Sequence, residues 1–420
     1  MRNGFLGALG LLMAMAIAFL GACAPSSSSG GNHPADDDAS PADDDASPTD
    51  DDDNDTTPPA DDDGSPDDDD NDDTSPADDD DNDDNDDNDN DDTTPPTDDD
   101  NDDDSATDVF AVGDNGTILH YDGTTWSPMA SGTTLPLQCV WGSSGSDVYA
   151  VGVGTIIYFD GSAWSNVPNV PEAGNVNFDG VWGTSPSDVL AVGGDQSSGR
   201  AVIMHYNGTM WSVQWTAGAS LGLSQLRGVW GSADSGVFAV GEWSLDNYPP
   251  SPPVTGGFVV DKDGASWTTS ANSDMFGPFL AVWGTSHSDV FAVGWIPNET
   301  GNPGGNQIVH YDGVSWSDMA VPTQDVAAVY GIWGTSSSDV FAIGQYYKLA
   351  FIDHYDGSSW SQLITSPFQF LGLWGGFAAD VFVVGCDGNA GLIVHYDGSA
   401  WITMLAGLPN PLWSVWGVAK

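Results

Sequence analysis

The residues best suited to chemistry are the histidine and aspartate of short motifs such as His354–Trp360, which reads HYDGSSW. A histidine two residues before an aspartate could form part of a metal site or an acid–base pair. The motif, however, is written seven times, and its substitutions follow turn geometry: Asn207 replaces the aspartate, and Tyr158 and Asp261 replace the histidine. We therefore predict a structural role, with a partly buried hydrogen-bonding histidine, an Asp-Gly turn and a tryptophan wedged between repeats.

A second recurring aspartate precedes the segment VFAVG and its variants. In the fourth repeat its place is taken by Ser235 or Gly236, which suit a turn but supply no carboxylate. A carboxylate after Gly, Ser or Thr can accept backbone N–H bonds in a tight turn. We assign the same scaffold role to the six that are present: Asp108, Asp147, Asp188, Asp289, Asp339 and Asp380.

These motifs belong to repeats that fill residues 107–420. The tryptophans of successive VWG, IWG or LWG segments lie 41 to 53 residues apart, which is the spacing of propeller blades: Trp141, Trp182, Trp230, Trp283, Trp333, Trp374 and Trp416. Each repeat predicts four short strands, namely VWG, DVFAVG, IVHY and WSxM. Asp-Gly between the third and fourth predicts a tight hairpin, because both residues tolerate positive φ.

The two ends of the array predict a closed ring. The first repeat begins at Thr107 without its VWG segment, and the chain ends with an unaccompanied VWG from Val415. Together the fragments make one blade if the C-terminal strand docks beside the N-terminal three, which covers the open sheet edges. The predicted fold is an all-β, seven-bladed propeller of four-stranded blades.

The charge of the chain excludes one class of partner. Sixty-three acidic residues stand against 6 basic ones, a formal net charge of −57. Such a surface repels phosphate backbones, so we expect no nucleic-acid binding. A monomer is expected, and a cationic or neutral partner remains open.

Residues 23–106 are predicted to be a disordered acidic linker. From Ser26 to Asp104 the chain is almost entirely Asp, Asn, Ser, Thr, Pro, Gly and Ala, with nothing to bury against the entropy of ordering. Aspartate runs suggest calcium loops, but no run places a turn glycine with a bidentate carboxylate after it. We expect only weak, non-specific divalent cation binding there, and no cofactor.

The first 22 residues predict a signal peptide. Arg2 precedes an apolar run from Phe5 to Leu20 that is short for a stable membrane span. Residues 20–23, LGAC, resemble a bacterial lipobox, and this resemblance implies a lipidated Cys23 that anchors the chain in a membrane through acyl chains. Ala24, in the second position of the mature chain, resembles the residue found in lipoproteins that are sorted to the outer membrane. We expect a cell-envelope, outer-membrane lipoprotein, either surface-exposed or facing the periplasm; an ordinary secretory peptide is the alternative.

Two further cysteines, Cys139 and Cys386, lack metal-ligand spacing. The export compartment would permit a disulfide between them, but we favour buried free thiols.

The repeat unit VWG…DVFAVG…HYDGxxW resembles that of bacterial secreted β-propeller lipoproteins, with a general likeness to kelch and Asp-box propellers. The resemblance covers residues 107–420 and implies extracellular binding or scaffolding. The sequence departs from the Asp box in its Asp-to-Gly spacing and from kelch in its lack of a repeated double glycine, which only Gly193 and Gly194 approach. WD40 signatures are absent.

Long, variable connections in blades 3 to 5 are the predicted binding region. Strand order places second-to-third and blade-to-blade connections on one face, and loops on rigid scaffolds carry recognition. We expect a glycan or protein ligand to contact aromatic and acidic side chains in this arc, and unselected insertion is the alternative. The candidates are Trp215, Trp243, Tyr248, Trp295, Glu242, Asp246 and Glu299.

An enzyme such as a glycosidase or lyase is a competing interpretation, and a purely structural envelope scaffold is another. A sialidase-type propeller needs an arginine cluster, but residues 107–420 contain only Arg200 and Arg227. A glycosidase or lyase could use two carboxylates, but no single carboxylate stands out from the repeats. The sequence also has no Gly-rich phosphate loop, no Ser/His/Asp order that breaks the repeat and no metal cluster. We therefore predict no catalytic residues and no metal site.

Overall fold

The computed structural model describes residues 108–232, 236–245, 254–264, 266–270, 277–298, 301–322 and 327–418. The chain separates into two units, residues 1–93 and 94–420, and every described residue belongs to the second. The predicted signal peptide, Cys23 and the acidic linker thus lie outside the described residues.

The described residues form seven four-stranded antiparallel sheets, numbered here as blades 1 to 7. Blade 1 takes its first strand from the C-terminus, and each other blade is four consecutive strands. Blade 1 consists of β28 (Leu412–Val418), β1 (Asp108–Gly113), β2 (Ile118–Tyr121) and β3 (Trp126–Met129); blade 2 of β4 (Leu137–Ser144), β5 (Asp147–Gly152), β6 (Thr155–Phe159) and β7 (Trp164–Asn166); and blade 3 of β8 (Val176–Ser185), β9 (Asp188–Asp195), β10 (Arg200–Tyr206) and β11 (Trp211–Thr216). Blade 4 consists of β12 (Leu223–Ser232), β13 (Gly236–Leu245), β14 (Val254–Asp263) and β15 (Ser266–Ser270); and blade 5 of β16 (Phe279–Ser286), β17 (Asp289–Pro297), β18 (Pro303–Tyr311) and β19 (Trp316–Asp318). Blade 6 consists of β20 (Ala327–Ser336), β21 (Asp339–Tyr346), β22 (Leu349–Tyr355) and β23 (Trp360–Ser366); and blade 7 of β24 (Gln369–Phe377), β25 (Asp380–Asp387), β26 (Ala390–Tyr396) and β27 (Trp401–Leu408).

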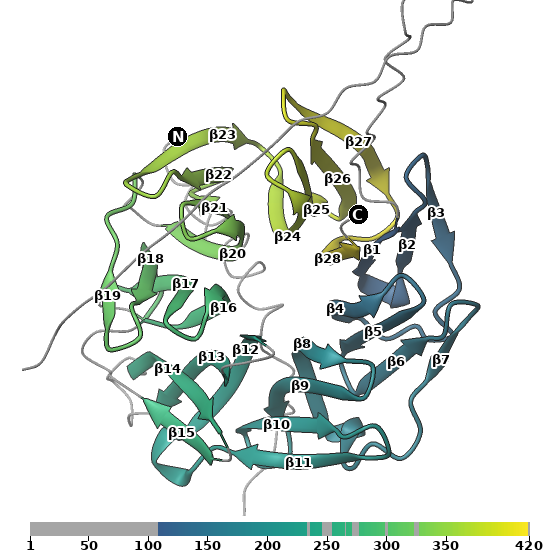
Figure 1. The fold of residues 1–420 in the computed structure, drawn as a ribbon, viewed down its shortest axis with the longest axis vertical. Helices are drawn as coiled ribbons and strands as arrows, with labels where there is room; N and C mark the ends of the chain where they lie inside the picture. The colour runs from purple at the N-terminus through teal and green to yellow at the C-terminus, as the bar shows by residue number, and fades with distance from the viewer. Residues whose placement is uncertain are drawn as a thin grey trace, which may run out of the picture. The chain divides into compact units, whose positions relative to one another are not determined.

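The seven sheets surround a common centre, with the first strand of each blade innermost (Figure 1). The ring closes as predicted, because β28 pairs antiparallel with β1 and sets Trp416 opposite Phe110. Helical structure among the described residues is limited to three 3-10 turns, Asp114–Gly116, Ala173–Asn175 and Ala219–Leu221. None of these described residues forms a helix long and apolar enough to cross a membrane.

The Asp-Gly turn after the third strand, predicted as a tight hairpin, spans more than these two residues. Tyr121 pairs with Trp126, which leaves four residues in the loop. Gly123 alone takes a positive φ, of 87°, while Asp122 Oδ1 accepts the backbone N–H groups of Thr124 and Thr125. The carboxylate thus satisfies donors that a shorter turn would leave to water, and Asn207 does the same in blade 3.

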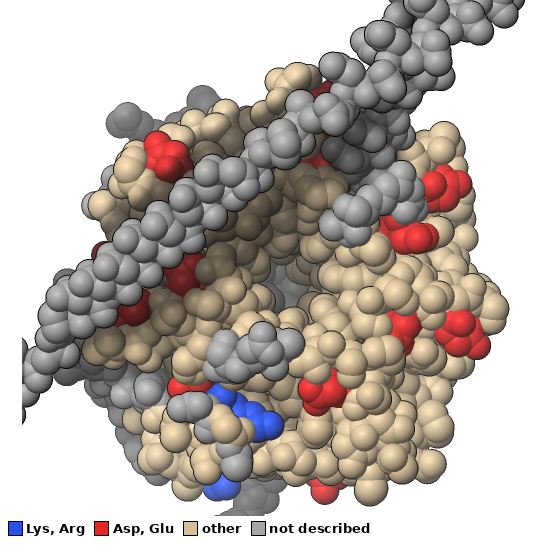
Figure 2. All heavy atoms as spheres, viewed as in Figure 1, with Lys and Arg blue, Asp and Glu red and all other residues tan. Residues whose placement is uncertain are grey.

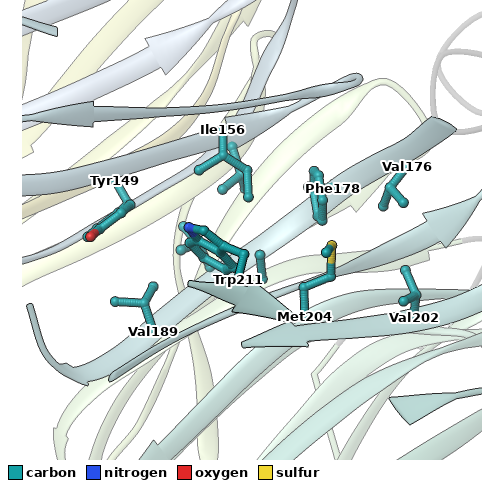
Figure 3. Close-up of a cluster of buried hydrophobic side chains, with 11 residues drawn as sticks. Tyr149, Ile156, Val176, Phe178, Val189, Val202, Met204 and Trp211 are labelled. Carbon is teal, nitrogen blue, oxygen red and sulfur yellow. The ribbon is translucent and has the colours of Figure 1, made fainter. Parts of the chain in front are cut away.

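The core lies between blades, in seven clusters of buried apolar side chains. Figure 3 shows the cluster between blades 2 and 3, where Trp211 lies between Tyr149 and Met204. Alternation along each strand sends side chains to both faces of the sheet, so each blade packs against two neighbours. The hydrophobic energy of folding is therefore shared around the whole ring.

The VWG segments join the blades in a continuous chain of contacts. A Cβ added at Gly183 would lie 2.7 Å from Cη2 of Trp141 in the preceding blade, and the same relation links Gly142 to Trp416 and Gly417 to Trp374. Each tryptophan thus packs over the glycine that follows the tryptophan of the next blade. This contact explains why the tryptophan is followed by glycine.

The antiparallel order gives the ring two unlike faces. The face where first strands begin and second strands end carries the second-to-third and blade-to-blade connections; we call it the loop face, and Asp114, Glu242 and Trp295 lie there. The opposite, turn face carries the DG turns. The space-filling view shows one face hollowed at its centre, with acidic side chains over several blades and few basic ones (Figure 2).

Candidate functional site at the inner-strand bulges

The recurring histidines and aspartates pair with each other inside single blades. Nε2 of each histidine lies 2.6 to 2.8 Å from Oδ1 of the aspartate that begins the second strand. In blades 3, 5 and 6 the threonine four residues before this aspartate, as Thr184 before Asp188, donates its hydroxyl to the other carboxylate oxygen. The hydroxyl thus contacts the carboxylate rather than the imidazole, which is not the arrangement that activates a serine nucleophile. The pairs are His120–Asp108, His205–Asp188, His310–Asp289, His354–Asp339 and His395–Asp380.

Blade 4, which lacks both partners, takes a histidine from its neighbour. In blades 1, 5, 6 and 7 the histidine ring lies against a phenylalanine of the second strand, as His310 does against Phe291 at 4.5 Å. In blade 4 that place, 4.8 Å from Phe238, is filled by His287 of blade 5. A Cβ added at Gly236 would meet His287 Nδ1 at 2.7 Å, so glycine makes room for the borrowed ring. The histidine ring therefore fills a packing position in the blade, and a neighbouring blade can supply it.

Two of the predicted binding residues, Trp215 and Trp243, belong to the core between blades 3 and 4. Trp243 is 7% exposed, and its ring lies over Gly256. Trp215 is partly buried and stacks on Phe258 at 6.4 Å. Burial of Trp243 means that its substitution would perturb packing before it could report on a ligand.

Two others, Glu242 and Trp295, occupy equivalent places on the loop face. Each directly follows the glycine that ends the DVFAVG segment of its second strand, and each is partly exposed. We call this set of equivalent positions the rim: Asp114, Val153, Gly194, Glu242, Trp295, Gln345 and Cys386. The remaining candidates, Asp246, Tyr248 and Glu299, lie outside the described residues.

Every first strand carries a β-bulge two residues before its VWG valine or that valine's equivalent. In β12, for example, Leu226 pairs with Gly241 and Gly228 pairs with Val240, so Arg227 has no partner in the ladder. A bulge re-aims the extra side chain. We call the seven bulged residues the channel ring: Gln138, Asp179, Arg227, Leu280, Tyr330, Leu371 and Trp413.

The channel ring lies on the wall of the central channel, near the loop face. Its apolar members, Leu280, Tyr330, Leu371 and Trp413, belong to none of the seven core clusters and are partly exposed, although the strands that carry them are innermost. Side chains of the ring contact the rim of the same blade. Tyr330 donates its hydroxyl to Gln345 Oε1 at 3.3 Å, and Trp413 Nε1 donates to Asp114 Oδ1 at 2.8 Å.

Arg227 links blades 3 and 4 in a nearly buried ion network. Its Nε donates to Glu242 Oε1 at 3.0 Å, its Nη2 donates to the same oxygen, and its Nη1 lies 3.5 Å from Asp179 Oδ1. Gln225 donates to the other oxygen of Asp179. The Arg227 side chain is 7% exposed, so loss of either carboxylate would leave a buried charge poorly compensated.

Burial raises the pKa of Asp179 to about 6, although the Arg227 guanidinium and the Gln225 amide act in the opposite direction. The carboxylate accepts hydrogen bonds from two donors, Arg227 and Gln225. Both carboxylates of the network are bound to the same guanidinium, which anchors them as a fixed polar patch. No group of three or more His, Cys, Asp or Glu side chains in the part of the chain that the structure describes could hold a metal ion.

Both cysteines in the described part of the chain are free thiols. Cys139 is partly buried in β4, and Cys386 is buried in β25, where its thiol bonds Gln369. Burial raises the pKa of Cys386 to about 11, which keeps the thiol protonated and unreactive at neutral pH.

Sequence reasoning missed the channel ring, although a signal was present. The segments that precede the tryptophans read QCV, DGV, RGV, LAV, YGI, LGL and WSV. The position two residues before the valine, isoleucine or leucine varies among polar, charged, aliphatic and aromatic residues, while its flanks stay small or apolar. A variable position inside an otherwise uniform strand marks a side chain that the packing between blades does not specify.

No protein-family model matches the chain, and no curated protein matches it. Solved structures do. YCF48 from Cyanidioschyzon merolae is 15% identical with a TM-score of 0.46, and YCF48 bound to D1 peptide is 14% identical with 0.45; each match covers 72% of this chain and 92% of the other. The SapL1 lectin in complex with alpha methyl fucoside is 13% identical with a TM-score of 0.42, over 73% of this chain and 97% of the lectin.

A provisionally assigned 6-phosphogluconolactonase from Bacteroides uniformis is 11% identical with a TM-score of 0.49, over 74% of this chain and 99% of that one. At these low sequence identities, the similarity to the solved structures concerns the fold alone.

Proposed function

We propose that the propeller is a non-catalytic binding module whose ligand contacts the loop face around the central channel. The observation that carries the proposal is the channel ring: seven strands repeat the same bulge, and each bulge presents a different side chain from its neighbours in the ring. A position needed only for packing would repeat its residue type, as Trp141 and Gly142 do around the ring. Diversity on a rigid, repeated frame is what recognition requires.

The position of the module at the cell surface is a second part of the proposal. Signal peptide 1–22 is removed, Cys23 is lipidated and held in the outer membrane, and residues 24–106 act as a disordered acidic tether. Cys23→Ser is expected to abolish incorporation of labelled palmitate and to move the protein from the detergent phase to the aqueous phase on phase separation. Retention of label by the variant would contradict the anchor.

Binding itself is tested with the purified full-length protein on a glycan array and in pull-downs with cell-wall fragments, each with calcium and with a chelator. Saturable binding to either is expected to weaken in Trp295→Ala, because the partly exposed ring lies on the rim. Met210→Ala, on the exposed turn between β10 and β11 of the opposite face, is the matched control. Equal loss in both variants would contradict the placement on the loop face.

An enzyme remains the second candidate, and Asp179 is the observation that favours it. A carboxyl group with its pKa raised to about 6 has the property of a general acid. A panel of glycosidase and lyase substrates, assayed with the native protein and with Asp179→Asn, decides between the two. Turnover lost in Asp179→Asn would replace the binding module with a carbohydrate-active propeller.

A further inference from the structure

The channel ring divides into two chemically distinct arcs. Blades 2, 3 and 4 contribute a polar arc of Gln138, Asp179 and Arg227. Blades 5, 6, 7 and 1 are consecutive around the ring and contribute an apolar arc of Leu280, Tyr330, Leu371 and Trp413. Apolar side chains that are partly exposed, and that no blade interface buries, gain free energy when a ligand covers them.

The charge around the arcs is negative. The channel ring and the rim together hold three carboxylates, Asp114, Asp179 and Glu242, and one guanidinium, Arg227. Arg227 already pairs with two of the carboxylates, Asp179 and Glu242, so its positive charge is neutralised within the protein. Asp114 lies beside the apolar arc, where its carboxylate accepts the Trp413 indole N–H and has further acceptor capacity. The surroundings of the apolar arc therefore favour a cation.

We propose that the channel ring binds a protruding loop of a protein partner, which places an apolar side chain on the apolar arc and an adjacent Lys or Arg near Asp114. This inference rests on the proposed function and specifies its ligand class. Charge complementarity selects the partner, because an acidic site attracts a basic segment and repels an acidic one. The chain's own tether does not fit, since residues 24–106 contain no Lys, no Arg and no large apolar residue.

The composition of the arc favours a protein loop over a sugar. Tyr330 and Trp413 supply aromatic faces, on which a sugar could also stack, whereas Leu280 and Leu371 present branched aliphatic surface that suits an apolar side chain better. Aliphatic and aromatic side chains in a concave site are typical anchors for one inserted apolar residue. Leucines in two of the four blades thus favour an apolar amino-acid side chain as the occupant.

The probe is a synthetic peptide array with every pair of residues at two adjacent positions in a Gly-Ser frame, incubated with the purified full-length protein. Peptides that combine Leu, Ile, Met or Phe with Lys or Arg are expected to bind about tenfold more tightly than those with Ala or with Asp. Leu371→Asp is expected to remove binding of the selected peptides. Asp114→Asn, which keeps the acceptor for Trp413, is expected to weaken it about threefold and to reduce the preference for Lys and Arg.

Two matched controls separate the site from general effects. Leu363→Asp introduces the same charge at an exposed leucine on the outer strand β23. Asp122→Asn removes one charge on the turn face and reproduces the turn that Asn207 makes. Both controls are expected to bind as the native protein does, and circular dichroism verifies that all four variants fold.

The outcomes distinguish this inference from the function on which it rests. Peptide selection that depends on Leu371 and Asp114 supports both. Saturable glycan binding without peptide selection retains the binding module and overturns the protein loop. Peptide binding that is equal in Leu371→Asp and Leu363→Asp overturns the channel ring as the site, because the acidic tether would then account for the attraction.

Discussion

Asp353 in β22 is a carboxylate in an apolar place. It is 1% exposed, and its Oδ1 has no hydrogen-bond partner among the described residues. Burial raises the pKa of Asp353 to about 7. The equivalent residue of every other blade is apolar: Leu119, Ile157, Met204, Val260, Val309 and Val394. Asp353 thus replaces a buried apolar residue of the repeat, and its buried carboxyl group lowers the stability of the fold.

The cost depends on pH in a defined direction. A carboxyl group whose pKa is higher in the folded than in the unfolded state makes the fold lose stability as pH rises from about 4 to about 7. Asp353→Val is expected to remove this dependence and to raise the free energy of unfolding at pH 8 by about 1–3 kcal/mol. Denaturant unfolding at pH 4.5 and pH 8 measures the change. Asp353→Asn should lose the pH dependence with a smaller gain, and a native-like pH slope in both variants would contradict the raised pKa.

At the scale of the element, the first strand of each blade combines a packing position, which repeats its residue type, with a bulged position whose residue type varies. The tryptophan of VWG covers the glycine of the next blade, and the bulge three residues before the tryptophan carries a channel-ring residue. Substitution of that glycine should therefore disturb two blades at once, while substitution of an apolar bulged residue such as Leu371 should leave the fold intact.

Gly183→Ala tests the packing position. Its new Cβ would lie 2.6 Å from Asp188 O and 2.7 Å from the Trp141 ring, and we expect a loss of about 1–3 kcal/mol of stability. Gly174→Ala, with open space around it, should change stability by less than about 0.5 kcal/mol. Thermal unfolding of both variants makes the comparison. Equal midpoints for the two would refute the Trp-over-Gly contact.

At the scale of the whole molecule, the ring depends on the last strand. β28 supplies the inner strand of blade 1, and Leu412 and Val415 are buried in the core cluster between blades 7 and 1. Without β28 the inner edge of β1 would be unpaired and both flanking blades would lose part of their interface. Closure makes stability a property of all seven blades together.

Deletion of residues 412–420 is expected to abolish cooperative thermal unfolding and to cause aggregation, whereas deletion of residues 419–420 alone should have little effect. A synthetic peptide with residues 409–420, added in trans, should restore part of the lost stability by pairing with β1. A deletion variant that unfolds at the native midpoint would show that β28 does not close the ring.

The sequence by itself determined the repeat, the four strands of each blade and the closure of the ring. Each of these depends on local alternation of apolar residues or on matching half-repeats at the two ends, both of which are visible in linear order. The tertiary structure decided which side chains are exposed to a ligand and which are buried between blades. Trp243 is buried because Gly256 of the neighbouring strand receives its ring, and His287 serves blade 4 from blade 5. The bulges turn the channel ring out of the blade interfaces, and a bulge depends on the pairing partner rather than on the strand's own residues. The proposed binding surface thus depends on the tertiary structure, which brings seven distant segments around one channel.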